Sequence, residues 1–161
     1  MESVKGTGTT VSVLLPFIEA LPEPVQTPRL PAMGTDTGSS ILVVEDDSAV
    51  RAFVVATLEH AGYRVMATGS SSQAAALAEG LNEHIDLLLT DVVMPGGNGQ
   101  DLADRLLVNR PSMRVVLMSG YDSTPTAGSR DEGFMFLPKP FGANELTAAV
   151  RQSLSEPERP R

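Results

Sequence analysis

Leu87-Leu88-Leu89-Thr90-Asp91 is the stretch of sequence that decides the fold. Its first four residues belong to the most apolar segment of the chain, 85–90, which has the length of a strand. A strand that is apolar on both sides is typical of a parallel sheet covered by helices on both faces. Asp91 ends this run, so we expect it at the carboxyl end of a central strand.

Strand-like and helix-like segments alternate on both sides of this run. Val50, Val54 and Leu58, for example, have the spacing of one helix face, and Gly62 follows as a stop signal. This alternation predicts an α/β fold, a doubly wound five-stranded parallel sheet with flanking helices and right-handed crossovers. The expected strands are 41–44, 63–68, 85–90, 114–118 and 134–137, and the expected helices are 48–61, 70–80, a segment ending near 109, and 142–154.

The segments outside this pattern divide the chain further. In residues 1–17, a glycine-threonine turn at 6–10 precedes a β-branched run that predicts one strand. Residues 18–38 contain closely spaced prolines, which predict an extended linker. We therefore expect one domain of ordinary size at 39–155 and a polar tail at 156–161.

Composition narrows the possible functions. The 161 residues carry a net charge of −8, which argues against a nucleic-acid partner because phosphate contacts need clustered Lys and Arg. The absence of cysteine excludes disulfides, thiolate zinc sites and cysteine nucleophiles. No apolar stretch reaches the ~20 residues of a membrane span, and the first residues do not resemble a signal peptide. We expect a cytoplasmic protein without direct membrane contact.

Polar residues follow four of the expected strands, at what would be one edge of the sheet. They are Glu45 and Asp46, Asp91, Ser119 and Lys139. Oxygen ligands without His or Cys favour Mg²⁺, and a carboxylate can attack phosphorus to form an acyl phosphate. A lysine and a hydroxyl would stabilise the phosphoryl oxygens. Taken singly, these residues have ordinary alternatives: helix caps, turn formers or a solvated lysine.

The same residues lie in motifs that resemble the receiver domain of two-component response regulators. The segments are 41–47 with its acidic pair, 87–95 with an aspartate before a Met-Pro turn, 115–120 with a Ser-Gly pair, and 136–141 with Lys-Pro-Phe. The resemblance covers about 40–154, and four motifs agree in order and spacing. It implies a flavodoxin-like receiver fold.

The resemblance also implies a role for each matching residue. Asp91 would be the phosphoacceptor and, with Asp46, a ligand of Mg²⁺. Glu45 would act on the ion through a water, and the backbone carbonyl of Val93 would complete the metal site.

Further positions correspond to the family's phosphoryl contacts and switch. Ser119 and Lys139 would contact the phosphoryl group, and the bond before Pro140 would be cis. Ser119 and Phe136 would form the switch, although Phe136 lacks the hydroxyl of a tyrosine. The implied partner is a histidine kinase or a histidine phosphotransfer domain.

The sequence departs from the family between two of these motifs. Residues 121–133 occupy the place of the family's fourth helix but are polar and broken by Pro125, Gly128 and Gly133. We expect that helix to be short or disordered.

Residues 1–17 resemble the end of a histidine-kinase ATP-binding domain, where a Gly-Thr turn precedes the last strand. This resemblance implies that the chain is the C-terminal receiver of a hybrid sensor histidine kinase; the alternative is an unrelated tail. Without the rest of the kinase core, the chain is not expected to bind ATP. His60 and His84 lack the context of a phosphodonor, so the donor is expected in another domain or protein.

Three functions are compatible with these sequence features. The first is a Mg²⁺-dependent phosphoacceptor, which modifies itself and is not a turnover enzyme. The second is a receiver that binds partners without phosphorylation, and the third is an aspartate-nucleophile hydrolase. Val93 stands where such hydrolases carry a second aspartate, which counts against the third. We expect Val93 and Tyr121 to restrict water and to slow dephosphorylation.

Overall fold

The computed structural model describes residues 2–4, 8–10, 38–80, 84–120 and 134–155. By its contacts the chain divides into two units, Met1–Ala32 and Met33–Arg161. The expected strand at 11–17, the linker at 18–38 apart from its last residue, and the expected short or disordered fourth helix within 121–133 lie outside the described residues.

The first unit contains an antiparallel pair of strands, β1 (Glu2–Val4) and β2 (Gly8–Thr10). The sequence analysis placed 8–10 in a turn, and that was wrong. Thr9 and Thr10 are β-branched, which suits an extended strand, and Thr9 pairs with Ser3 across the hairpin.

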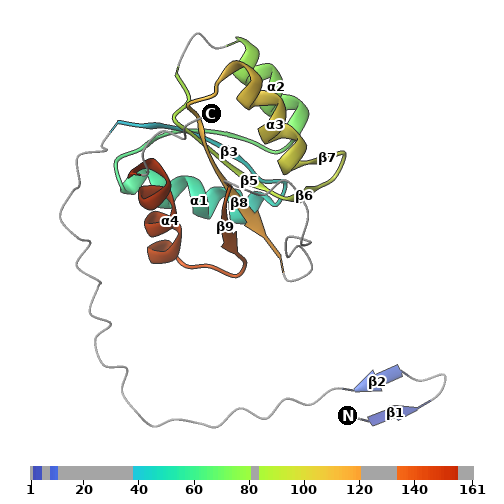
Figure 1. The fold of residues 1–161 in the computed structure, drawn as a ribbon. Coiled ribbons are helices and arrows are strands. Elements are labelled where there is room, and N and C mark those ends of the chain that lie inside the picture. Colours follow the sequence, from blue (N-terminus) through green and yellow to red (C-terminus); the bar gives the residue numbers. More distant parts are fainter. Residues whose placement is uncertain (1, 5–7, 11–37, 81–83, 121–133, 156–161) are drawn as a thin grey trace, which may run out of the picture. The chain divides into compact units, whose positions relative to one another are not determined.

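The second unit is built on a five-stranded parallel sheet (Figure 1). The strand order is β4-β3-β5-β8-β9, with crossovers on both sides of β3. This order confirms the predicted doubly wound fold. The strands are β3 (Ser40–Val44), β4 (Arg64–Thr68), β5 (Leu87–Asp91), β8 (Arg114–Ser119) and β9 (Met135–Pro138).

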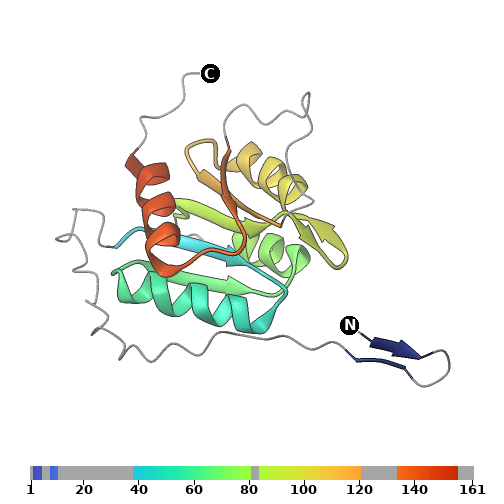
Figure 2. The same ribbon diagram turned by 90° about the horizontal axis from the view of Figure 1, so that it is seen from below.

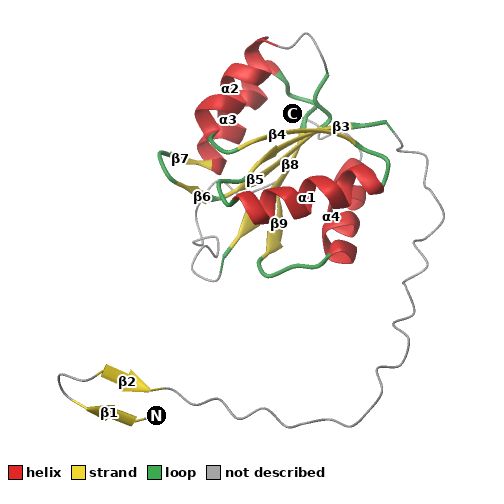
Figure 3. Cartoon of the chain, turned by 180° about the vertical axis from the view of Figure 1, so that it is seen from behind, coloured by secondary structure: helices red, strands yellow, loops and turns green. Residues whose placement is uncertain are grey.

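Within the described residues, four helices cover the two faces of the sheet. Figures 1 and 2 show α1 and α4 on one face and α2 and α3 on the other, and Figure 3 shows the same layers from behind. Each strand divides its side chains between two cores: Leu88 packs toward α2 and α3, and Leu87 and Leu89 toward α1 and α4. The helices are α1 (Ser48–His60), α2 (Ser71–Gly80), α3 (Gly99–Asn109) and α4 (Ala143–Ser155).

The boundaries of α1 follow from local chemistry. The Asp47 carboxylate accepts hydrogen bonds from the backbone N–H groups of Ala49 and Val50, which have no partner within the helix. These two bonds lower the pKa of Asp47 below its ordinary value. At the other end, Gly62 adopts a φ of 94°, a conformation that favours glycine.

The glycine-rich segment after β5 is more regular than expected. The glycines at 96, 97 and 99 would ordinarily indicate a loop, but β6 (Val93–Met94) and β7 (Gly97–Asn98) form a two-stranded antiparallel ladder. Gly96 turns between them with a φ of 77°. Gly99 then begins α3 so close to β5 that a Cβ there would lie 2.0 Å from the backbone oxygen of Asp91.

We therefore predict that Gly99→Ala destabilises the chain by ~1–3 kcal/mol, because an added methyl must displace the backbone at Asp91. Gly80→Ala is the matched control, since a Cβ on that helical glycine meets nothing within 4 Å. It should leave stability unchanged or raise it by up to ~1 kcal/mol. Urea unfolding measures both, and equal midpoints for Gly99→Ala and wild type would contradict the close approach.

Candidate functional site

The sequence-predicted polar residues meet at the carboxyl edge of the parallel sheet. Glu45 and Asp46 follow β3, Asp91 ends β5, Ser119 ends β8 and Lys139 follows β9. Parallel strands deliver their carboxyl ends to the same edge, so the topology brings together residues that are up to 94 positions apart.

Lys139 joins two of the carboxylates directly. Its Nζ donates to Glu45 Oε2 and to Asp91 Oδ2, both at 2.7 Å. Glu45 is 1% exposed, and the side chains of Asp91 and Lys139 are 14% and 24% exposed. These are partly desolvated ion pairs, in which solvent screens the charges less than at the surface.

Burial and the neighbouring charges together shift the pKa of two members of this group. Burial raises the pKa of Glu45 above its ordinary value, and Lys139 reverses only part of that effect. Burial alone would lower the pKa of Lys139, but hydrogen bonds to Asp91 and Glu45 outweigh it and the net pKa is raised. Lys139 offsets only part of the effect of burial on Glu45, because Glu45 is nearly inaccessible to solvent and shares the Lys139 cation with Asp91.

A possible metal site adjoins this ion pair. Glu45, Asp46 and Asp91 each offer a carboxylate oxygen, and these oxygens lie within 4.8 Å of one another. Asp46 is exposed, so a hydrated ion can reach it. An all-oxygen donor set that leaves room for water suits Mg²⁺, the ion that receiver domains bind at an acidic pocket.

The remaining predicted residues surround the charged group. Val93 N–H donates to Asp91 Oδ1 at 3.1 Å, while the Val93 side chain is 67% exposed. Ser119 is buried, and its backbone carbonyl accepts a 2.7 Å hydrogen bond from Lys139 N–H. The Lys139–Pro140 bond is cis, the expected isomer. Phe136 is half-buried and packs against the core under α2 and α3 rather than among the charges.

Sequence reasoning missed one contact at the site. Arg51, one turn into α1, donates from Nη1 to the backbone oxygens of Glu45 and Asp46. Its position four residues after the Asp47 cap is a signal that it faces back toward that loop, but side-chain direction could not be read from spacing alone.

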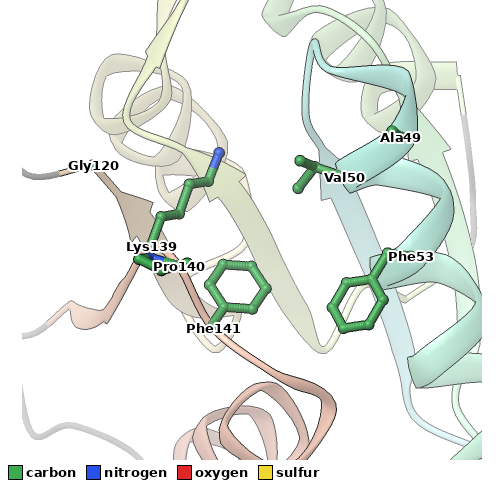
Figure 4. Close-up of a pocket in the computed structure, with 7 residues that line it drawn as sticks. All are labelled: Ala49, Val50, Phe53, Gly120, Lys139, Pro140 and Phe141. Carbon is green, nitrogen blue, oxygen red and sulfur yellow. The ribbon is translucent and has the colours of Figure 1, made fainter. Parts of the chain in front are cut away.

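A groove of about 550 Å³ also adjoins the charged group. Phe53 and Phe141 face each other across it, with ring centroids 6.5 Å apart (Figure 4). Phe53 is 42% exposed although it is large and apolar. The lining residues are Ala49, Val50, Phe53, Gly120, Lys139, Pro140 and Phe141.

The fold and the site define a class: a doubly wound α/β protein with a carboxylate–lysine centre at the carboxyl edge of its sheet. Comparison with known protein families identifies the family. The family model of the response regulator receiver domain matches residues 41–151, more than half of the chain. The chain belongs to this family and is a receiver domain of two-component signal transduction.

Curated relatives include both response regulators and a sensor kinase. The DNA-binding transcriptional regulator NtrC of Azospirillum brasilense is 38% identical over an alignment of 122 residues, which covers 74% of this chain and 25% of NtrC. The sensor kinase CckA of Brucella abortus is 31% identical over an alignment of 164 residues, which covers 96% of this chain and 17% of CckA. The chain thus spans about a quarter or less of the length of these relatives.

Solved structures agree with the family. The receiver domain of the hybrid histidine kinase CckA is 34% identical with a TM-score of 0.63, over 73% of this chain and all of that one. A receiver domain from Clostridium thermocellum is 26% identical with a TM-score of 0.65, over 72% of this chain and 94% of that one.

None of the described helices is long and apolar enough to cross a membrane.

The raised pKa of Lys139 gives a prediction that NMR can test. The chain has only two lysines, Lys5 and Lys139, so Lys139→Arg assigns both side-chain signals. In metal-free solution Lys139 should titrate above the ordinary value of about 10.4.

The same shift fixes the sign of a stability effect. A lysine whose pKa is raised by folding contributes stability that is complete below its unfolded pKa. That stability is lost as pH rises through the folded pKa. A Lys139 signal that titrates at or below the ordinary value would contradict the double ion pair.

Proposed function

We propose that Asp91 is the phosphoacceptor of this receiver, taking a phosphoryl group from a phosphohistidine with the help of Mg²⁺. The observation that carries this proposal is the contact of Lys139 Nζ with Asp91 Oδ2. A cation at 2.7 Å from the attacking carboxylate is placed to contact the oxygens of an incoming phosphoryl group.

The reaction follows from these positions. An oxygen of Asp91 attacks phosphorus, and the bond between phosphorus and the histidine nitrogen breaks. The nitrogen keeps the electron pair and takes a proton from solvent. Lys139 stabilises charge on the phosphoryl oxygens, and Asp46, Asp91 and the Val93 carbonyl would hold the ion, with Glu45 acting through a water. Bound Mg²⁺ would offset the charge of the carboxylates and of the phosphoryl oxygens.

We further propose that Ser119 and Phe136 transmit the modification. Ser119 ends β8, and its backbone oxygen is already tied to Lys139. A phosphoryl group on Asp91 would draw the Ser119 hydroxyl toward it and favour the second state of a two-state equilibrium. Phe136, in the adjoining strand β9, would move with that change.

The phosphodonor we propose is a histidine kinase or a histidine phosphotransfer domain, acting in the cytoplasm.

We also propose that residues 1–17 are the end of a kinase ATP-binding domain. The match to CckA supports this because it covers 96% of the chain, well beyond the receiver model at 41–151. The coding sequence upstream of Met1 tests the idea: a kinase core would support it, and an unrelated sequence would overturn it.

The phosphoacceptor proposal predicts covalent modification by a small donor. With acetyl phosphate and Mg²⁺, the intact protein should gain the mass of one phosphoryl group, and chelation of Mg²⁺ should prevent the gain. Asp91→Asn should remove it, whereas Asp101→Asn, an exposed carboxylate of α3, should keep it. Intact-mass spectrometry measures all four conditions.

Two results would sink the proposal: no gain in the wild type, or a gain that survives Asp91→Asn. Absence of any effect of Mg²⁺ and beryllofluoride on the spectrum of the protein would instead favour a receiver that binds partners without phosphorylation.

Val93 gives a prediction about the lifetime of the modified state. An apolar side chain beside Asp91 should exclude the attacking water, so Val93→Gln with Tyr121→Gln should shorten the lifetime of phospho-Asp91 several-fold. Val108→Gln is the control because Val108 is also an exposed valine but lies on α3. The loss of phosphoryl mass over time measures the lifetime. Equal lifetimes for the double variant and wild type would contradict the prediction.

A further inference from the structure

Arg51 reaches from α1 back to the acidic loop that follows β3. Its Nη1 donates to the backbone oxygen of Glu45 at 2.5 Å and to that of Asp46 at 3.2 Å. Two carbonyl oxygens of consecutive residues therefore converge on one guanidinium nitrogen. This contact fixes the orientation of the peptide units on both sides of the Asp46 α-carbon.

The three acidic side chains of this loop differ in how they are held. Glu45 is paired with Lys139, and Asp47 caps α1. Within the part of the chain that the structure describes, no hydrogen bond or ion pair holds the Asp46 carboxylate. Its direction therefore depends on its own backbone, which is the part that Arg51 holds.

The other side of the guanidinium is also defined by the structure. A Cβ at Gly69 would lie 3.3 Å from Arg51 Nη1 and 3.7 Å from Cζ, so glycine leaves the space that the side chain needs. Gly69 directly follows β4, whose last residue, Thr68, accepts a hydrogen bond from Glu45 N–H at 3.2 Å. The loop is thus held by β4 and by Arg51 together.

We propose that Arg51 is a positioning residue for the metal: it holds the acidic loop so that the Asp46 carboxylate points at the ion-binding site beside Asp91. This inference rests on the proposed function of the site. The expected change in Mg²⁺ affinity on loss of Arg51 is opposite in sign to a simple charge effect. Removing a positive charge beside the acidic loop would strengthen cation binding, whereas loss of the backbone contact weakens it.

The test measures Mg²⁺ alone, by isothermal titration calorimetry on the full chain. Arg51→Gln should raise the Mg²⁺ dissociation constant roughly tenfold, the size of effect seen when groups that orient a metal ligand are lost. Arg51→Lys, which keeps a donor and the charge, should recover part of the affinity. Arg105→Gln is the control, because Arg105 pairs with Glu79 on α2 and does not contact the acidic loop.

A second variant keeps the arginine and disturbs its space. Gly69→Ala should weaken Mg²⁺ binding by less than Arg51→Gln does, and it should add nothing when Arg51 is already Gln, because both act through one contact. Urea unfolding of each variant checks that the fold is retained. Should Arg51→Gln fail to fold, Gly69→Ala and Arg51→Lys still test the contact.

The rate of phosphorylation by acetyl phosphate at increasing Mg²⁺ distinguishes failure of the Arg51 inference from failure of the proposed function. We expect Arg51→Gln to need more Mg²⁺ yet to reach the wild-type rate at saturation. Unchanged or tighter Mg²⁺ binding in Arg51→Gln would overturn the inference, as would a wild type that binds no Mg²⁺. A wild type that binds Mg²⁺ but is never phosphorylated, with weaker binding in Arg51→Gln, would overturn the proposed function and leave this inference standing.

Discussion

The double ion pair of Lys139 is the interaction on which the site depends. Two carboxylates from β3 and β5 converge at the edge of the sheet, and without a cation their repulsion would oppose that arrangement. Removing one partner of a desolvated pair leaves an uncompensated charge, which costs more than the pair itself contributes. Lys139 therefore makes it possible for Glu45 to be almost fully buried beside a second carboxylate.

The sheet makes this pairing geometrically possible. Its two faces are covered by helix pairs that bury apolar clusters, and the charged group lies at the edge where the strands end (Figure 1). The 2.7 Å hydrogen bond from Lys139 N–H to the Ser119 backbone oxygen fixes the lysine relative to β8 before its side chain reaches the carboxylates. The β8–β9 register thus positions the backbone of Lys139, and the two ion pairs hold its amine.

The sequence predicted much of this because the relevant signals are local. The apolar run to Asp91 and the acidic pair after 41–44 mark strand ends, and parallel topology converts strand ends into neighbours. The contact of Arg51 with two carbonyls was not predictable, because it depends on side-chain direction and on the space left by Gly69. The β6–β7 ladder was missed for a similar reason: glycines signal a turn but not the short pairing around it. The short or disordered fourth helix expected at 121–133 lies outside the described residues and stays a prediction.

The loop after β3 shows why neighbouring acidic residues are not interchangeable. Glu45 is buried and extends to Lys139, whereas Asp47 is short enough to fold back onto the N–H groups of its own helix. Asp46 lies between them, exposed and without such a contact in the described chain. A carboxylate that is already paired or capping has fewer free lone pairs to offer an ion than Asp46 has. Two acids of the loop thus make structural contacts. We propose that the third, Asp46, serves the metal and that Arg51 holds its backbone for that role.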